Sequence, residues 1–500
     1  MDKNNNLIPL LGYDYRCSVF DAGDHIRRIV SPEYYRFAEE IYRIYKNNNL
    51  NKIGIVNTEL DIESKNLIHE KHIISYPFEW TANMYKDAVL FHLNLFLKLD
   101  RHKLTLKDAL PNNIVFDFCN PVFVDFLSIV QTCNLKHETW FIKKNNYTEP
   151  RFAIFKVMFI PFMLAPLMAM AKNKYDQSRR MLSERACNCS GGIPRRQDVY
   201  PGGSLLKYGV VGKTLLKYLV KKLLLRNNEL PIYSRKPFYL FRLLLSKQKS
   251  TFVDFCVQLT QFVEAADVIP PKSGYLSYYG DKGEKFDLSD RSCWQDKQKT
   301  VSKLIDSEKP DTLLDIGTNT GWFSILAAQQ GIKVIATDVD ESSIDALYLY
   351  SRQNHLPILP LLIPFENMTR QIFGMDCNDP EYSDRNFKAT PLYLPATERL
   401  KSDMVLCLGL LHHLALGNGM SLADIIGILS KLTTKTLVLE YVDLQDRLIQ
   451  GELSFFTHID EYSANTYNIA VVMGEANRRF NSCEVVDSHP MTRKILICRK

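Results

Sequence analysis

The stretch DTLLDIGTNTGWF, residues 311–323, decides the fold of the C-terminal part of the chain. An apolar strand is predicted to end at Asp315-Ile316-Gly317, and a helix is predicted to begin after Gly321. Gly317 permits a tight exit from the strand, and Gly321 lets the helix start approach a ligand closely. Free backbone N–H groups at a helix start favour an anionic group, such as a carboxylate. The stretch therefore predicts a strand–loop–helix unit that can hold a small anionic ligand.

The loop between these glycines differs from a dinucleotide-binding fingerprint, which requires G-x-G-x-x-G. Here Asn319 occupies the middle of G-T-N-T-G, and this shorter loop suits a ligand without a pyrophosphate. The next predicted strand ends with Asp338, seventeen positions beyond Gly321. A carboxylate there can accept hydrogen bonds from both ribose hydroxyls. The pattern indicates a nucleoside site of the S-adenosylmethionine type, and the alternatives are a dinucleotide site and a loop without a ligand.

Strand and helix continue to alternate towards the C-terminus. Strands are predicted at TLLDIG, KVIATD, ILPLLI, DMVLCLG and TLVLEYV, and helices at Trp322–Gln330, Glu341–Gln353 and Leu422–Leu432. Such alternation with short turns predicts a parallel, doubly wound α/β sheet. The final CEVVDSHPMTRKILICRK has two strands around a turn at Ser488–Pro490 and no helix between them. These residues predict an antiparallel hairpin that closes the sheet.

This pattern resembles the class I S-adenosylmethionine-dependent methyltransferases over residues of roughly 290–500. The resemblance implies a seven-stranded Rossmann-like sheet, S-adenosyl-L-methionine as cofactor, and cofactor-binding roles for Asp315, Gly317, Asn319, Gly321 and Asp338. Other segments resemble a bacterial subgroup with a long N-terminal extension, related to the nodulation methyltransferases. They are ISYPFEW, LKDALPNNIVF, NPVFVDFLSI, FMLAPLMAMA, LGLLHHLALGN and LEYVDLQD. The acceptor of that family is poorly defined, so the resemblance implies the cofactor more firmly than the acceptor.

The chain departs from this family after the third strand of the sheet. Family members often place an aspartate there to reach the adenine, whereas this chain has Pro364 in PLLIPFEN. Glu366 or Asn367 is expected to take over that contact, unless the backbone does. The family-like segment EFVPKxD is EYVDLQD here, which keeps Glu440 and Asp446 and loses the proline.

Candidate residues for the acceptor side follow the fourth and fifth strands. His412 and His413 lie in LLHHL after the fourth strand, whose end faces the transferring methyl group in this fold. Methyl transfer to oxygen or nitrogen releases a proton that a histidine can take. In-line positioning alone can lower most of the barrier, and one histidine could simply pack at a helix start. Glu440 ends the fifth strand and either binds a substrate hydroxyl or ammonium group or caps a loop.

One N-terminal loop resembles that of a phosphotransferase. In KDALPNNIVFDFCNPVFVDF, residues 107–126, Asp108 stands five residues before Asn113, and a predicted strand pair leads to Asp125. Aminoglycoside-kinase-like and protein-kinase-like enzymes use this layout to orient a hydroxyl and to hold magnesium. Leu106 replaces the usual histidine, and neither a glycine-rich phosphate loop nor a clearly placed lysine is found. A kinase-like scaffold is therefore favoured over an active kinase, and a coincidence of turn residues is the other alternative.

Three regions are predicted: a kinase-like α+β region at 1–135, a mainly helical connecting region at 136–275, and the methyltransferase domain at 276–500.

The apolar residues 152–170 contain two prolines and predict a buried helical pair rather than a membrane span. The basic stretch 203–250 contains an amphipathic helix pattern, which either packs on its own core or contacts an anionic membrane surface. Tyr278, Tyr279 and Lys297 precede the first strand, where this fold generally has a lid.

Composition is typical of a globular protein, with 46% hydrophobic and 24% charged residues among 500. A net charge of +6 is too small to indicate a nucleic-acid partner. Eleven cysteines without a C-x-x-C pair indicate reduced thiols and no metal site, and the first residues lack a signal-peptide pattern. These features predict a cytoplasmic protein and leave its oligomeric state open.

Together these patterns predict methyl transfer from S-adenosyl-L-methionine to an oxygen or nitrogen of a small-molecule or sugar-like acceptor. The N-terminal regions are expected to shape the acceptor site. The alternatives are a bifunctional kinase–methyltransferase, a non-catalytic S-adenosylmethionine-binding protein, and an enzyme that uses residues 203–250 to act on nucleic acid or at a membrane surface.

Overall fold

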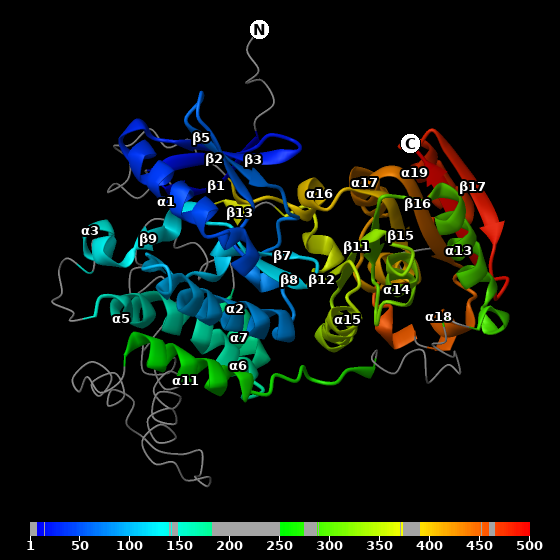
Figure 1. Cartoon of the computed structure of the whole chain (residues 1–500). Coiled ribbons are helices and arrows are strands. Elements are labelled where there is room, and N and C mark those ends of the chain that lie inside the picture. Colours follow the sequence, from blue (N-terminus) through cyan, green and yellow to red (C-terminus); the bar gives the residue numbers. More distant parts are fainter. Residues whose placement is uncertain are drawn as a thin grey trace, which may run out of the picture. The chain divides into compact units, whose positions relative to one another are not determined.

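The structure is a computed structural model (Figure 1). It describes residues 8–14, 16–139, 142, 149–182, 251–274, 288, 290–370, 372–373, 391–451, 453–459 and 466–500. The basic stretch 203–250 and the residues Tyr278 and Tyr279 lie outside the described residues. The chain divides into two compact units. Unit 1 comprises Met1–Phe78, Ala82–Pro270 and Ile372–Tyr393, and unit 2 comprises Glu79–Thr81, Pro271–Gln371 and Leu394–Lys500.

Unit 2 is built on a mixed sheet with the strand order β12-β11-β10-β15-β16-β18-β17. The strands are β10 (Thr312–Ile316), β11 (Lys333–Asp338), β12 (Ile358–Leu362), β15 (Ser402–Cys407), β16 (Thr433–Val442), β17 (Ser482–Asp487) and β18 (Arg493–Arg499). Neighbouring strands from β12 to β16 are parallel, while β18 is antiparallel to both β16 and β17. The predicted doubly wound α/β sheet and its antiparallel C-terminal hairpin are therefore confirmed.

Helices lie between the strands of unit 2 as the alternating pattern predicted. They are α13 (Asp296–Glu308), α14 (Trp322–Ala328), α15 (Glu341–Gln353), α16 (Ala396–Arg399), α17 (Leu422–Leu432), α18 (Arg447–Gly451) and α19 (Ile469–Asn477). Shorter turns are η9 (Arg291–Cys293), η10 (Phe365–Asn367), the π-helical η11 (His413–Gly417) and η12 (Leu453–Phe455). The bounds of α15 and α17 match the prediction because side chains cap both starts: Asp340 accepts from the Ser343 N–H and Ser421 from the Asp424 N–H.

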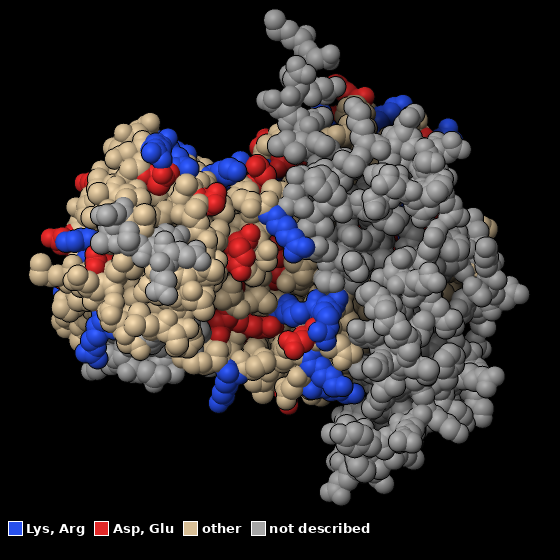
Figure 2. Space-filling model, turned by 180° about the vertical axis from the view of Figure 1, so that it is seen from behind, with Lys and Arg blue, Asp and Glu red and all other residues tan. Residues whose placement is uncertain are grey.

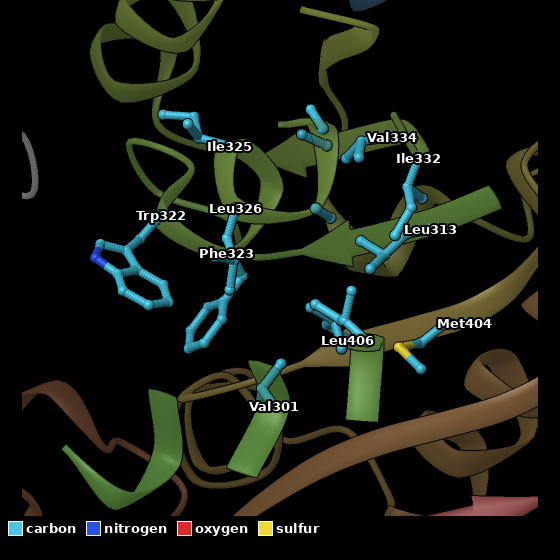
Figure 3. Packing of buried hydrophobic residues seen from close by; sticks show 14 of the residues in the cluster. Val301, Leu313, Trp322, Phe323, Ile325, Leu326, Ile332, Val334, Met404 and Leu406 are labelled. Carbon is cyan, nitrogen blue, oxygen red and sulfur yellow. The ribbon is translucent and has the colours of Figure 1, made fainter. Parts of the chain in front are cut away.

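Different helices pack on the two faces of the sheet. Helices α13, α14 and α15 share one core cluster with alternate strand residues, including Val301, Leu313, Val334 and Leu406 (Figure 3). Intervening residues such as Leu314 point to the other face because strand side chains alternate. On that side α17 contacts β15 and β16, and α19 contacts β17 and β18. Burial on both faces explains why the parallel strands read as nearly continuous apolar runs.

Unit 1 begins with an antiparallel sheet in the order β1-β2-β3-β5-β4. Its strands are β1 (Ile8–Asp14), β2 (Cys17–Asp21), β3 (His25–Val30), β4 (Thr58–Asp61) and β5 (Asn66–Glu70), with α1 (Tyr35–Asn47) between β3 and β4. Three strand pairs follow: β6 (Leu104–Leu106) with β9 (Ile129–Gln131), β7 (Ile114–Asp117) with β8 (Asn120–Phe123), and β13 (Ile372–Phe373) with β14 (Pro391–Tyr393). Short 3₁₀ turns are η1 (Pro32–Tyr34), η2 (Leu50–Ile53), η3 (Pro77–Glu79, across the division between the units), η4 (Pro111–Asn113), η5 (Phe126–Ser128) and η6 (Thr132–Asn134).

The helices of unit 1 are α2 (Ala82–Asp100), α3 (Leu135–Glu138), α5 (Arg151–Ile154), the π-helical η7 (Phe155–Leu164), α6 (Ala165–Met170), α7 (Tyr175–Met181) and α11 (Phe252–Glu264). Segments α5, η7 and α6 follow one another without a break, so one helical run replaces the predicted pair. The wider π turns accommodate Pro161, which has no N–H to donate.

Aromatic rings join three of these helical segments. The ring centroids of Phe96 and Phe155 lie 5.1 Å apart, and those of Phe155 and Phe252 lie 5.3 Å apart. Helix α2, the run through η7, and α11 therefore share one core. The described helices between residues 136 and 270 belong to unit 1. Among the residues that the structure describes, no helix combines the length and apolar character that a membrane span requires.

Candidate functional site

The loop after β10 has the backbone that its glycines predicted. Gly317, Asn319 and Gly321 all have positive φ, at 73°, 53° and 85°. A Cβ atom on Gly321 would lie 2.4 Å from Cδ1 of Leu347, and one on Gly317 would lie 3.2 Å from Cδ2 of Leu410. The positive φ angles favour glycine at both positions, and a side chain would also crowd Leu347 or Leu410. Asparagine tolerates the left-handed region better than most residues.

Asp338 joins this loop to the end of β11. One of its carboxylate oxygens accepts from the Asn319 N–H at 2.7 Å, and the other accepts from the Asp340 N–H at 2.8 Å. Burial raises the pKa of the Asp338 carboxyl, and these backbone hydrogen bonds act in the opposite direction. Each carboxylate oxygen has a second lone pair, so Asp338 can also accept hydrogen bonds from a ligand.

Asp315 fixes the loop against the start of α14. Its Oδ2 accepts from Thr318 Oγ1 at 2.8 Å and from Ser324 Oγ at 2.7 Å. The side chain is buried, and burial raises its pKa to about 6 against the effect of these two hydrogen bonds. Both contacts are inside the strand–loop–helix unit, so Asp315 can act on a ligand by holding the loop in place.

Glu366 and Asn367 lie in η10, just after β12, and both side chains are exposed. The strand before them is tied to the Asp338 position, because the Ile363 N–H donates to the Asp338 carbonyl oxygen at 3.1 Å. Glu366 and Asn367 therefore follow β12, the edge strand of the sheet, and β12 lies next to β11, which carries Asp338.

His412 and His413 begin the helical segment after β15. Their ring centroids lie 4.2 Å apart, and both rings pack beside Phe456 at 5.8 Å and 5.5 Å. His412 is buried whereas His413 is half-buried. Burial lowers the pKa of His412 well below its usual value, and the neighbouring His413 lowers it further. His412 is therefore neutral near pH 7.

Glu440 lies inside β16 and is fully buried. Its Oε2 accepts from Lys297 Nζ at 3.1 Å, and Nη1 of Arg493 lies 3.9 Å from its Oε1. A Cβ atom on Gly409 would lie 3.6 Å from Oε2, so the carboxylate sits beside the loop that follows β15. Glu440 thus forms an ion pair with Lys297 beside this loop.

A second buried ion pair adjoins Glu440. The Asp446 carboxylate accepts from Arg493 Nε at 3.0 Å and from Thr492 Oγ1 at 2.6 Å. Burial raises the pKa of Asp446, but these hydrogen bonds outweigh it and hold the pKa at about 2. Sequence reasoning missed Arg493. The predicted hairpin was the available signal, because it pairs Arg493 with Val442 at the end of β16.

The sheet topology brings these residues to one edge. Connections from β10 run outward through β11 to β12, whereas β15 and β16 lie on the other side of β10. In such sheets ligands bind outside the carboxyl ends of the strands at this reversal. The close approach of Leu410 to Gly317 shows that the loops after β10 and β15 touch there. The predicted cofactor residues and His412, His413 and Glu440 therefore surround one reversal point.

The kinase-like residues of unit 1 have hydrogen-bond or ion-pair partners within that unit. Asp108 Oδ1 accepts from Asn113 Nδ2 at 2.5 Å and from Ser128 Oγ at 2.8 Å. Asp125 pairs with Arg28 of β3 at 3.1 Å. Within the described ranges, no group of three or more His, Cys, Asp or Glu side chains is arranged to hold a metal ion.

The visible charges do not form a single basic surface. On the face shown in Figure 2, Lys and Arg side chains of the described residues are interspersed with Asp and Glu. A mixed surface of this kind lacks the continuous positive field that attracts a polyanion.

No protein-family model matches the chain. The nodulation protein NoeA of Rhizobium meliloti (strain 1021) is 25% identical over 417 residues, which are 78% of this chain and 73% of NoeA. Because the match spans 417 residues, it includes parts of both units.

Among solved structures, magnesium protoporphyrin IX methyltransferase (ChlM) from Synechocystis PCC 6803 with bound SAH is 13% identical and has a TM-score of 0.28. The match covers 45% of this chain and 95% of ChlM. A structure of the bifunctional kinase-methyltransferase WbdD is also 13% identical, with a TM-score of 0.29 and coverage of 44% and 41%. Scores this low support no inference about activity. The chain is therefore similar to NoeA over most of its length.

Proposed function

We propose that this chain is an S-adenosylmethionine-dependent methyltransferase that acts on a small-molecule or sugar-like acceptor. The observation that carries this proposal is the hydrogen bond between the Asn319 N–H and Asp338, at 2.7 Å. This bond joins the loop Gly317–Gly321, which contains three residues with positive φ, to a carboxylate at the end of the next parallel strand. The loop lies beside the point at which the strand order of the sheet reverses. A nucleoside attached to a short charged group fits such a site better than a dinucleotide does, because the loop lacks the third glycine.

Along the site, successive residues would contact the methionine end, the ribose and the adenine of S-adenosylmethionine. The loop Gly317–Gly321 would lie beside its methionine end, although each backbone N–H of this loop already donates a hydrogen bond within the chain. Asp338 would accept from the ribose hydroxyls. Glu366 and Asn367, exposed after β12, would lie beside the adenine. Asp315 would act indirectly, since it already binds Thr318 and Ser324.

When bound, this cofactor supplies a methyl group activated by a positively charged sulfur. The chain would orient the acceptor atom in line with that methyl group and exclude water from it. His412 is neutral, but the burial that lowers its pKa also makes it a weak base for the proton that the acceptor loses. Half-buried His413 stands beside it as the second candidate. Glu440 would hold the acceptor through a hydrogen bond.

We infer that unit 1 helps to select the acceptor and that its kinase-like residues serve as a scaffold. The similarity to NoeA extends beyond unit 2, so part of unit 1 is shared by the two proteins. The Arg28–Asp125 ion pair disfavours the bifunctional alternative, since it occupies the carboxylate that would hold magnesium.

The direct test uses S-adenosylmethionine labelled in its methyl group. Purified protein should bind it stoichiometrically and transfer label to a component of a small-molecule extract. Binding without transfer to any extract fraction would favour a non-catalytic S-adenosylmethionine-binding protein. Absence of binding would contradict the proposal.

A further inference from the structure

Two buried polar atoms lie unsatisfied on the acceptor side of the site. Glu440 is 0% exposed, and its Oε1 has no hydrogen-bond partner in the part of the chain that the structure describes. His412 is 6% exposed, and its Nδ1 likewise lacks a partner there. Buried polar atoms are nearly always hydrogen-bonded in native proteins, to protein or to ordered water. These two atoms can therefore hydrogen-bond to a bound group, because none of the described residues supplies a partner for them.

The charged side chains around these atoms restrict the charge that a bound group can carry. Glu440 and Asp446 contribute two negative charges, and Lys297 and Arg493 contribute two positive ones. An ammonium group beside Glu440 would also meet Lys297 at its Oε2 and Arg493 near its Oε1. An anionic group would meet the Glu440 carboxylate itself. Like charges repel strongly in a buried setting, so an uncharged hydrogen-bonding group fits best.

Lys297 supplies the donor that complements the free acceptor of Glu440. It lies in the first turn of α13, and its side chain is 21% exposed, in contrast to the 0% of Glu440. An ammonium group has three N–H donors on a flexible stem. Lys297 can therefore keep its contact with Glu440 and donate to a second oxygen on the solvent side.

We propose that Lys297 and Glu440 bind the methyl acceptor through two adjacent hydroxyl groups of an uncharged molecule. One hydroxyl donates to Glu440 Oε1, and its neighbour accepts from Lys297. This inference rests on the proposed methyltransferase function and narrows its acceptor to neutral compounds with vicinal hydroxyls. Lys297 then acts as a residue that determines specificity.

The experiment uses protein saturated with S-adenosylhomocysteine and titrated with neutral sugars, followed by saturation-transfer NMR and calorimetry. The probes are the methyl glycosides of glucose, mannose, galactose and fucose, with glucuronate and glucosamine as charged counterparts. At least one neutral glycoside should bind more tightly than both charged sugars, by about 10-fold or more.

Variants test the two named residues. Lys297→Met and Glu440→Gln should each weaken binding of that glycoside by about 10-fold or more and leave the affinity for S-adenosylhomocysteine unchanged. Lys303→Met, on the exposed face of the same helix, should change neither affinity. Lys297→Met removes a partner of the buried Glu440, so its glycoside affinity is compared in protein whose unchanged affinity for S-adenosylhomocysteine shows that it remains folded.

Three outcomes would overturn the inference: no neutral glycoside binds, a charged sugar binds best, or Lys297→Met retains full glycoside affinity. Failure of the wild-type protein to bind S-adenosylhomocysteine would instead contradict the proposed function itself.

Discussion

The main-chain N–H of Asn319 lies 2.7 Å from a carboxylate oxygen of Asp338. This bond joins the loop after the first strand of the C-terminal sheet to the end of the second strand. Asn319 has a positive φ of 53°, and the conformation directs its N–H towards Asp338. The bond thus fixes the loop and the proposed ribose-binding carboxylate relative to each other, and such preorganisation limits the entropy lost on binding.

Substitution of Gly321 should separate backbone strain from crowding. In Gly321→Ala the new Cβ atom would lie 2.4 Å from Leu347 Cδ1, at a φ of 85°. The matched control is Gly331→Ala, which has the same φ of 85° and no heavy atom within 4 Å of the new Cβ. We expect Gly331→Ala to lower the free energy of unfolding by about 1–2 kcal/mol, and Gly321→Ala to lower it further.

Urea unfolding of both variants measures this difference. Equal losses of unfolding free energy would show that Leu347 moves aside freely and that crowding does not require the glycine.

Asp315 should make stability depend on pH in a defined direction. Its carboxyl pKa is raised from 3.8 to about 6 in the folded chain, so the folded state binds the proton more tightly than the unfolded state. The contribution of Asp315 to stability is therefore present below pH 3.8 and is lost as the pH rises through about 6. A shift of roughly 2 pKa units corresponds to about 3 kcal/mol.

Urea unfolding between pH 4 and pH 7 tests this effect with Asp315→Asn, which cannot ionise. The stability of the variant relative to the wild type should rise across this interval. A difference that stays constant with pH would contradict the raised pKa of Asp315.

Arg493 should be important for the stability of the acceptor side. It pairs with buried Asp446 at 3.0 Å and lies 3.9 Å from buried Glu440. Arg493→Met would remove a positive charge that offsets the negative charges of both buried carboxylates. Loss of one partner of a buried ion pair typically lowers the free energy of unfolding by about 3–5 kcal/mol. Lys494→Met is the control, because Lys494 pairs with exposed Asp487 and surface pairs contribute about 0–1 kcal/mol. Similar unfolding free energies for the two variants would refute this role of Arg493.

Unit 1 should not bind MgATP. The Asp125 carboxylate is paired with Arg28, and Asp108 accepts from Asn113 and Ser128. Calorimetric titration with ATP and magnesium should therefore show no heat of binding. Magnesium-dependent ATP binding that Asp125→Ala abolishes would revive the bifunctional alternative.

Local sequence signals predicted the C-terminal unit well. The apolar runs of its strands reflect burial on both faces, and the side-chain caps Asp340 and Ser421 mark where α15 and α17 begin. The unusual backbone at Gly317 and Gly321 was also predictable, because few other residues adopt a positive φ.

Contacts between distant residues were not predictable in the same way. Lys297 and Glu440 are 143 positions apart, and Arg28 and Asp125 are 97 positions apart. Such pairs depend on how whole elements pack, which no local pattern encodes. The π-helical run through Pro161 was missed for a related reason, because proline normally predicts a break and surrounding core contacts overrode it.

The central claim is that the G-x-N-x-G loop and Asp338 bind S-adenosylmethionine. It is tested most directly by calorimetric titration of S-adenosylhomocysteine into the wild type, Asp338→Ala and the control Asp306→Ala, which alters an exposed aspartate of α13. The account predicts saturable binding by the wild type and the control, and a loss of about 100-fold or more in Asp338→Ala while it remains folded. Equal affinity in folded Asp338→Ala, or no binding by the wild type, would contradict it.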